Sequence, residues 1–261
     1  MNEPKPPTPA ERAQWQQDPD QPVVIYQKWR DLLFAHWSFD PDVIQATLPE
    51  GLRVDTFHHR GWVGVVPFYM KDVHPRFVPA VPMISDFLEL NVRTYVLDKE
   101  GRPGVWFYSL DCNQWLAVTI ARTGYFLPYW ETAMQATRDE QGMIDYRCHR
   151  RNQPKATRFW YGGHGAPHFA EPGTLEFFLV ERYLLFSRDP ASGDIHCGRV
   201  HHAPYPLLTP KLAAFDTVML EMNGLPLPEG SPEQIHFSPG VDVRTYALHR
   251  CCESSLPSGS A

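Results

Sequence analysis

Short apolar runs, several of which alternate with polar residues, recur along most of the chain. Gly, Pro, Asn and Asp residues separate these runs, which span 23–26, 31–39, 62–70, 87–97, 105–110, 159–161, 175–186 and 195–202. Runs of this length between turn-forming residues predict β-strands. The pattern therefore predicts a mainly β (α+β) fold, in which an antiparallel sheet is closed or strongly curved and a few helices lie at its periphery.

Residues 87–97 are the most informative run because their alternation separates two kinds of side chain. One face carries Leu88, Leu90, Val92, Thr94 and Val96, and the other carries Phe87, Glu89, Asn91, Arg93 and Tyr95. Alternate residues of a strand point to opposite faces. The polar face has two interpretations. It is either the solvated outer face of an antiparallel sheet or the polar lining of a small barrel that holds a ligand.

Two further segments give local predictions. Asp40 and Pro41 predict the start of a helix, since Asp is a favoured N-cap and Pro fits the first helical turn. The run 175–186 predicts a strand on which Glu181 and Tyr183 share a face while Arg182 points the other way. Glu181 either needs a buried partner or lies at the edge of the sheet.

Proline content limits the architecture. The chain has 26 prolines among 261 residues, about twice the usual share of roughly 5%. Because proline is excluded from helix interiors and central strands, many short segments are expected instead of a bundle of long helices. The polar, proline-rich stretch 1–21 predicts a disordered N-terminal arm, and 251–261 predicts a flexible tail. Residues 22–250 between them predict one domain.

Charge and cysteine content exclude several classes of protein. With 24 basic and 30 acidic residues the formal net charge is −6, which is not the basic character of a nucleic-acid binder. Five scattered cysteines without a CxxC pair favour a reduced, cytoplasmic protein. No signal-peptide core and no run of about 20 apolar residues is present, so no membrane partner is expected.

A metal site is not expected either. The group His196, Cys197, His201 and His202 alternates between strand faces and lacks a recognised zinc spacing. No cofactor motif is found in the sequence. We therefore expect neither a metal nor a cofactor.

Several segments together resemble a known superfamily. Trp29–Asp42 and the turn Leu48–Leu52 resemble the opening of acetoacetate decarboxylase. A closer resemblance, to the YqjF-like family of unknown function within that superfamily, covers about residues 23–248 and is carried by Glu89–Val96, Ser109–Asp111, Glu181–Tyr183 and Val200–Leu207. The resemblance implies a single acetoacetate decarboxylase-like domain, a cone-like β-barrel with its site inside.

The resemblance also implies site residues. Arg30 matches an arginine associated with the decarboxylase site, and Glu89 matches an active-site glutamate, so both are candidate catalytic residues. A second active-site glutamate of the decarboxylases falls near Val66 and is not retained. The candidate substrate-binding residues are Asn91, Arg93, Tyr95, Tyr129, Glu181 and His202.

The lysines depart from the decarboxylase pattern. In that family an Arg is followed six residues later by Pro and then by two adjacent lysines, the first of which forms a Schiff base. Here Arg122 and Pro128 keep the spacing, but Tyr129 and Trp130 follow. The chain has no adjacent lysine pair, its six lysines being Lys5, Lys28, Lys71, Lys99, Lys155 and Lys211. We therefore expect no lysine-dependent acetoacetate decarboxylase.

Three functions remain open. The first is an enzyme of lyase, isomerase or hydrolase type that acts on a small carbonyl or carboxylate compound, with Glu89 as base and Arg30 or Arg93 as anion clamp. The second is a non-enzymatic protein that binds such a ligand. The third is a structural or interaction module whose polar interior is a satisfied hydrogen-bond network. Strand edges of the barrel could also pair between copies of the chain, so the sequence is compatible with a homo-oligomer.

Overall fold

The computed structural model describes residues 5–81, 84–114, 124–151, 153–228 and 230–251. Within them, most of the secondary structure belongs to one 13-stranded sheet. Its strands are β1 (Ile25–Phe39), β2 (Arg53–Val54), β3 (Gly61–Pro75), β4 (Phe87–Leu97), β5 (Pro103–Cys112), β6 (Tyr129–Arg138), β7 (Ile144–Arg150), β8 (Thr157–His168), β9 (Leu184–Arg188), β10 (Ile195–His202), β11 (Leu207–Ala214), β12 (Gln234–Thr245) and β13 (His249–Arg250). The described helices are α1 (Pro9–Gln14), α2 (Pro41–Gln45), α4 (Leu175–Val180) and α5 (Val218–Met222). The mainly β prediction is confirmed.

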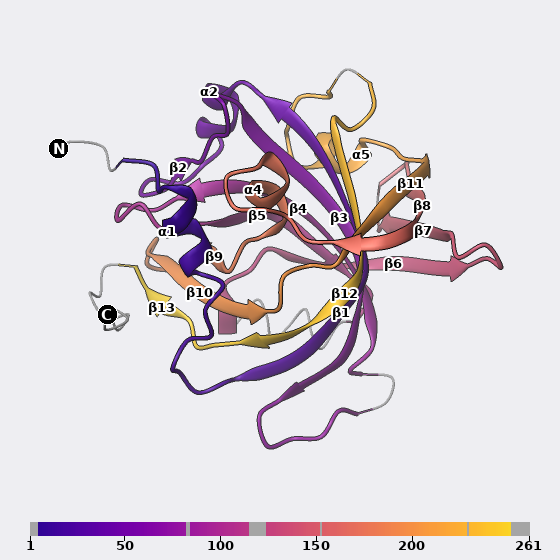
Figure 1. Ribbon diagram of the computed structural model, residues 1–261, viewed down its shortest axis with the longest axis horizontal. Helices are drawn as coiled ribbons and strands as arrows, with labels where there is room; N and C mark the ends of the chain where they lie inside the picture. Colours follow the sequence, from indigo (N-terminus) through magenta and orange to yellow (C-terminus); the bar gives the residue numbers. More distant parts are fainter. Residues whose placement is uncertain (1–4, 82–83, 115–123, 152, 229, 252–261) are drawn as a thin grey trace.

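Among these strands the sheet closes on itself twice. Because β10 also pairs with β12 and β5 also pairs with β4, one ring runs through β12, β1, β3, β4, β5, β9 and β10. A second ring runs from β5 through β6, β7, β8, β11, β12, β1 and β3 to β4. We call them the β9–β10 ring and the β6–β8 ring. Figure 1 shows the strands particular to each ring on opposite sides of the shared ones.

The strand β4 belongs to both rings, and all of its residues are buried. Phe87 and Tyr95 pack in a hydrophobic cluster with residues of β5, β10 and β12. Leu88, Leu90 and Val92 join another cluster with residues of β7 and β8. One face of β4 therefore lines each ring. The interpretation of the polar face as a solvated outer surface is wrong, because β4 has no solvent side.

The strand β1 changes the face that it presents to each ring at Asp31. Opposite β3, it holds one extra residue between Arg30 and Ala35, and Asp31 has a positive φ of 55°. An extra residue in one strand is a β-bulge, and it shifts every later side chain to the other face. Accordingly Trp29 before the bulge and Leu32 after it both face the β9–β10 ring.

Two local predictions are confirmed. The strand β4 has the bounds expected from its alternation. The helix α2 begins at Pro41, and the Asp40 side chain accepts a hydrogen bond of 2.9 Å from the Asp42 backbone N–H. Both features depend on neighbours in the sequence, which explains why they could be predicted.

The N-terminal segment corrects a prediction. Residues 5–21 of the expected disordered arm are described, and they pack against the barrel through α1 (Figure 1). A capping box of Thr8 and Glu11 fixes the start of α1, and Arg12 forms an ion pair with the buried Asp55 at 2.6 Å. The polar residues that suggested disorder thus supply a cap and an ion pair. Of the expected tail at 251–261, all but Cys251 lies outside the described residues.

Residues 175–186 form a helix and part of a strand, not the single strand predicted. The Thr174 side chain caps α4 by accepting from the Phe177 backbone N–H. Glu181 is the C-cap of α4, and β9 begins at Leu184. A short apolar run does not distinguish a strand from a buried helix by periodicity alone. The N-cap Thr174 was the available signal for the helix.

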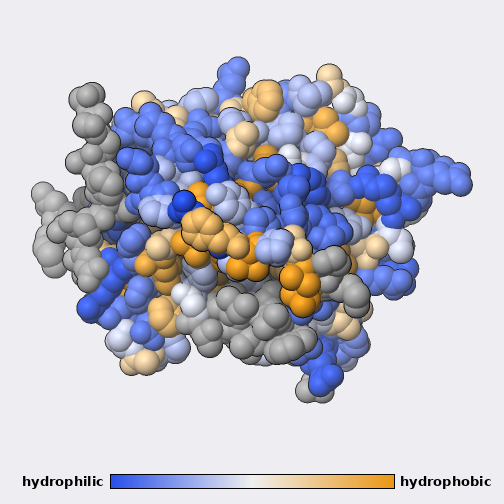
Figure 2. Space-filling view, turned by 90° about the horizontal axis from the view of Figure 1, so that it is seen from below, coloured by the Kyte–Doolittle hydropathy of each residue, from blue (hydrophilic) through white to orange (hydrophobic). Residues whose placement is uncertain are grey.

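One face of the molecular surface carries an apolar region (Figure 2). Figure 2 shows hydrophobic side chains gathered across the middle of one face, bordered by hydrophilic ones. The exposed large hydrophobic residues include four on the connection between β3 and β4, which are Phe77, Val78, Val81 and Ile84. Among the described residues, no helix is long and apolar enough to span a membrane.

A buried ion pair joins the strands where the β6–β8 ring begins. Arg150 donates from Nε and Nη2 to the two carboxylate oxygens of Asp111, at 2.6 and 2.7 Å. The Thr132 hydroxyl donates to the same carboxylate at 2.8 Å. Asp111 is fully buried, so its charge depends on these partners. The pair links β5, β6 and β7 at the junction where β6 runs parallel to β5.

Replacing Arg150 by Met should lower the free energy of unfolding by about 3–5 kcal/mol, because the Asp111 charge is left buried without its partner. Arg147→Met is the matched control: Arg147 lies on the same strand with its side chain 57% exposed, and its loss should change stability by about 0.5 kcal/mol or less. Urea unfolding measures both values. Equal effects of the two substitutions would contradict this role of the Asp111–Arg150 pair.

Candidate functional site

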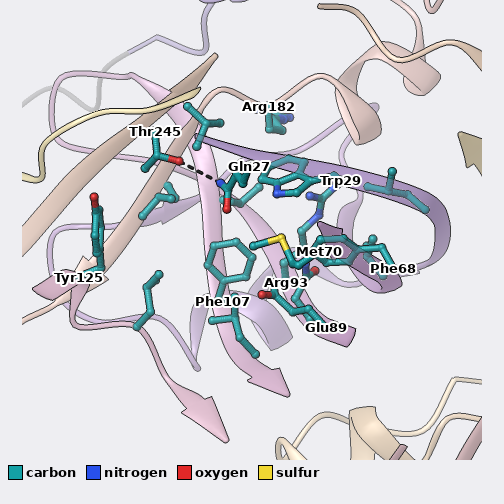
Figure 3. A pocket seen from close by; sticks show the side chains of 18 of the residues that line it. Gln27, Trp29, Phe68, Met70, Glu89, Arg93, Phe107, Tyr125, Arg182 and Thr245 are labelled. Carbon is teal, nitrogen blue, oxygen red and sulfur yellow. Dashed lines mark hydrogen bonds between the residues drawn. The ribbon is translucent and has the colours of Figure 1, made fainter. Parts of the chain in front are cut away.

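A cavity of about 140 Å³ lies inside the β9–β10 ring. Its wall is mainly apolar, with Trp29, Phe68, Met70 and Phe107 among the larger side chains. Figure 3 shows these residues around the hollow together with Glu89 and Arg93 from β4. The other polar side chains in the wall are Gln27, Asn91, Tyr125, Tyr129, Arg182, Tyr205 and Thr245. An apolar cavity with a few convergent polar groups is the usual form of a small-molecule site.

The polar residues of β4 form a strip along one wall of this cavity. Glu89, Asn91 and Arg93 are each at least 93% buried and lie at successive positions on one strand face. Alternate residues on a strand are about 7 Å apart, so the strip has a carboxyl group at one end and a guanidinium at the other. Tyr129, from β6, donates from its hydroxyl to Glu89 Oε2 at 2.7 Å. Four sequence candidates therefore meet in the cavity.

Burial changes the acidity of the Glu89–Tyr129 pair. Loss of solvation raises the pKa of Glu89 to about 7, although hydrogen bonds from Tyr129 and Asn91 act in the opposite direction. Burial and the neighbouring Glu89 together raise the pKa of Tyr129 well above its ordinary value. Tyr129 thus remains a donor, while Glu89 changes charge near neutral pH. A carboxyl group with such a pKa can accept or release a proton under physiological conditions.

At the other end of the strip, Arg93 has no carboxylate partner among the described residues. Its Nη2 donates to the Leu179 carbonyl at 3.1 Å, and its Nε has no hydrogen-bond partner. The Arg93 guanidinium also lies over the Phe34 and Tyr95 rings. Arginine keeps its charge in proteins, and a buried charge is unfavourable without a counter-ion. Arg93 is therefore a buried cation without a counter-ion among the described residues.

Arg30 lies elsewhere, which corrects the expectation that it joins Glu89. Its Nη1 donates to the Val241 carbonyl at 2.7 Å, and its Nη2 forms an ion pair with Asp242. Its side chain is 34% exposed and does not line the cavity. Uninterrupted alternation would place Arg30 on the same face as Leu32, but the bulge at Asp31 reverses the faces between them.

Three other candidates are buried beside the cavity without lining it. Tyr95 donates to the Leu179 carbonyl and contacts His36 Nε2, each at 2.7 Å. Glu181 accepts from the Tyr205 backbone N–H at 2.9 Å and from the Tyr183 hydroxyl. These contacts hold the end of α4 and the following turn in place. The sequence did not predict these positions. Alternation along β4 groups Tyr95 with Glu89, Asn91 and Arg93, and the predicted strand over 175–186 does not show that Glu181 caps a helix.

His202 is the third of these residues. Its ring stacks on Tyr183 with 4.6 Å between ring centroids, and its Nδ1 contacts the Ala203 carbonyl at 2.8 Å. Burial lowers the pKa of His202 to about 4, so the ring is neutral. No group of three His, Cys, Asp or Glu side chains able to hold a metal ion occurs in the part of the chain that the structure describes.

The sequence missed Arg182, which lines the cavity. A single strand over 175–186 predicts that Arg182 points away from Glu181 and Tyr183. In the structure, Arg182 instead follows Glu181, the C-cap of α4. The sequence also missed Gln27 and Thr245, whose side chains form a 2.9 Å hydrogen bond at the cavity wall (Figure 3). A prediction of α4 from its N-cap Thr174 would have removed the reason to point Arg182 away from the site. No local sequence signal marks Gln27 or Thr245 as cavity residues.

Comparison with known proteins gives the chain relatives in sequence and in fold. The YqjF protein of Bacillus subtilis (strain 168), which is described as uncharacterized, is 34% identical over 233 residues. The match covers 89% of this chain and 94% of YqjF. The model of the DUF2071 family, described as an uncharacterized conserved protein, matches residues 26–242.

Solved structures extend the likeness in fold. Acetoacetate decarboxylase from Legionella pneumophila has a TM-score of 0.63 at 14% identity, with 88% of each chain covered. The enduracididine biosynthesis enzyme MppR, solved in complex with pyruvate, has a TM-score of 0.59 at 11% identity, with 90% of this chain and 92% of MppR covered. The sequence and structural matches agree on one conclusion: the chain belongs to the DUF2071 family, is similar to YqjF over most of its length, and has the fold of the acetoacetate decarboxylases.

Proposed function

We propose that this protein binds a small carbonyl or carboxylate compound in the cavity of the β9–β10 ring and transforms it without a Schiff base. The observation that carries the proposal is Arg93, a buried cation in the cavity wall without a carboxylate partner among the described residues. A bound carboxylate would supply its counter-ion through charge-assisted hydrogen bonds. The Glu89–Tyr129 pair at the other end of the strip then faces the carbonyl end of the ligand.

The cavity limits the size of such a ligand. Its volume is about 140 Å³, and a protein cavity of about 150 Å³ accommodates benzene. A compound with roughly six or seven non-hydrogen atoms therefore fits. Small keto acids are of this size, and MppR, which shares the fold, has been solved in complex with pyruvate. This likeness supports the proposed ligand class.

The side chains in the cavity wall favour proton transfer over imine chemistry. No lysine lines the described part of the wall, and Tyr129 occupies the position at which the decarboxylase resemblance implies the Schiff-base lysine. Glu89 has a pKa of about 7, which suits a general base for a proton on the carbon next to a carbonyl. The Tyr129 hydroxyl can donate to the enolate oxygen that forms. A lyase or isomerase fits this arrangement.

A second candidate, a ligand-binding protein without turnover, is favoured by one contact. The Glu89 carboxyl group already accepts a 2.7 Å hydrogen bond from Tyr129. If this bond persists when the ligand is bound, Glu89 fixes the orientation of the ligand and does not remove a proton. Both candidate functions predict ligand binding, so binding experiments do not distinguish them. Only the enzyme predicts that protons of the bound ligand exchange with solvent.

Arg93→Met should weaken the binding of small keto acids. Loss of the charge-assisted hydrogen bonds should raise the dissociation constant for pyruvate by about 10–100-fold. Isothermal titration calorimetry at pH 7 measures this constant. The ligand-free variant should be at least as stable as the wild type, because an unpaired buried charge is removed. Arg147→Met, on an exposed position of β7, is the control. Unchanged pyruvate binding in Arg93→Met would refute the role of Arg93.

Glu89→Gln should retain binding but lose proton exchange. In deuterated buffer the wild type should exchange the methyl protons of bound pyruvate, and the rate should rise with pH up to about 7, where Glu89 becomes charged. The variant should be slower by about 100-fold or more. Proton NMR follows the loss of the methyl signal. Binding without exchange in the wild type would identify the non-enzymatic candidate instead.

The Glu89 pKa also predicts how stability depends on pH. Glu89 holds its proton more tightly in the folded protein, so its contribution to stability falls as pH rises from its ordinary pKa of 4.5 to about 7. The shift corresponds to about 3 kcal/mol. Glu89→Gln should gain this amount relative to the wild type between pH 4.5 and 7.5 in urea unfolding. Glu50→Gln, at an exposed site, should gain nothing. A pH-independent difference for Glu89→Gln would contradict the burial argument.

A further inference from the structure

A second buried arginine lines the same cavity. Arg182 is 7% exposed, and its Nη1 forms an ion pair with Asp55 at 2.9 Å. Its Nε donates to the Phe178 carbonyl at 2.8 Å. The remaining nitrogen, Nη2, is buried without a hydrogen-bond partner. Arg182 therefore has an unused donor group in the wall of the cavity.

Arg93 and Arg182 gather around the same structural features. The Cζ atoms of Arg93 and Arg182 lie 5.7 and 4.9 Å from the centroid of the Tyr95 ring. The two side chains donate to consecutive carbonyls, those of Leu179 and Phe178, at the end of α4. The end of α4 thus holds two guanidinium groups at one side of the cavity, and each has a nitrogen without a partner.

The charges around Asp55 leave this region positive. Asp55 is 1% exposed and accepts from both Arg182 and Arg12. Arg12 reaches it from α1 in a two-pronged contact, at 2.6 and 2.7 Å. One carboxylate therefore serves two arginines, while Arg93 has no carboxylate partner among the described residues. An excess of buried positive charge calls for an anion.

We propose that Arg182 is the second arm of an anion subsite with Arg93, and that this subsite takes the carboxylate group of the ligand. The inference rests on the proposed function and deepens it, because it assigns the acid end of the ligand to the end of α4. Two arginines around one carboxylate give directional recognition that a single guanidinium does not. The neutral amide of the same acid carries no charge and should be rejected.

The same geometry gives Arg12 a positioning role. Arg12 does not line the cavity, but it shares Asp55 with Arg182. Without Arg12, the whole charge of Asp55 acts on Arg182 and reduces the attraction of the subsite for an anion. The N-terminal segment therefore contributes to ligand preference through α1, in addition to any effect on stability.

The preference of the protein for pyruvate over pyruvamide tests the inference. Ligand-observed NMR competition measures it on the full chain for the wild type, Arg182→Gln, Arg182→Lys, Arg12→Gln and Arg12→Lys, with the exposed Arg147→Gln as control. The wild type should favour the acid by about 100-fold, since each of the two charged contacts is worth at least about 1.4 kcal/mol. Arg182→Gln should lower this preference about tenfold, to the part that Arg93 alone supplies, and Arg182→Lys should recover part of it. Arg12→Gln should lower the preference about threefold, and Arg12→Lys should restore it.

Three outcomes would overturn the inference. If Arg182→Gln keeps the wild-type preference, Arg182 is not part of the subsite. If it weakens acid and amide equally, the role of Arg182 is structural. These two results leave the proposed function intact as long as the wild type binds pyruvate in an Arg93-dependent manner. If the wild type binds neither compound, the proposed function and the inference both fail. Should Arg182→Gln not fold, the acid preference of Arg182→Lys and Arg12→Gln decides instead.

Discussion

The sharing of β4 by two closed rings is the constraint on which the candidate site depends. The strand β4 forms part of both rings, and all of its residues are buried. Apolar residues satisfy this requirement on the side of the β6–β8 ring. On the other side, Glu89 and Arg93 are charged or ionisable groups that the fold encloses. Burial raises the pKa of Glu89, and it leaves Arg93 without a carboxylate partner among the described residues.

The features that could be predicted from the sequence are those set by local pattern. Strict alternation gives the bounds of β4, and the Asp40-Pro41 pair gives the start of α2. The parts of the site that could not be predicted depend on single residues that interrupt a regular strand or start a helix. One extra residue at Asp31 reverses the faces of β1, so that Leu32 lines the cavity while Arg30 lies outside it. A threonine cap converts a predicted strand into α4, and this moves Arg182 to the cavity wall.

The chain shares its fold with the acetoacetate decarboxylases, but the shared fold does not establish a shared reaction. The chain shares their fold at identities of 14% and below in the structures described, so fold alone does not transfer the reaction. Tyr129 lines the cavity and donates a hydrogen bond to Glu89, and a phenol forms no imine. The cavity serves either proposed function, that of a catalyst or that of a binding protein. The proposed reaction differs from binding alone in requiring Glu89 to accept a proton.

The most direct test of the central claim is a crystal structure of the protein grown with pyruvate at pH 7. The proposed function predicts the ligand inside the β9–β10 ring, with its carboxylate within about 3.2 Å of the Arg93 guanidinium. The keto oxygen should lie toward the Glu89–Tyr129 pair. A cavity that holds only water at saturating pyruvate, or pyruvate bound at Arg30 outside the ring, would contradict it. Either result would mean that the enclosed polar strip serves the fold and not a ligand.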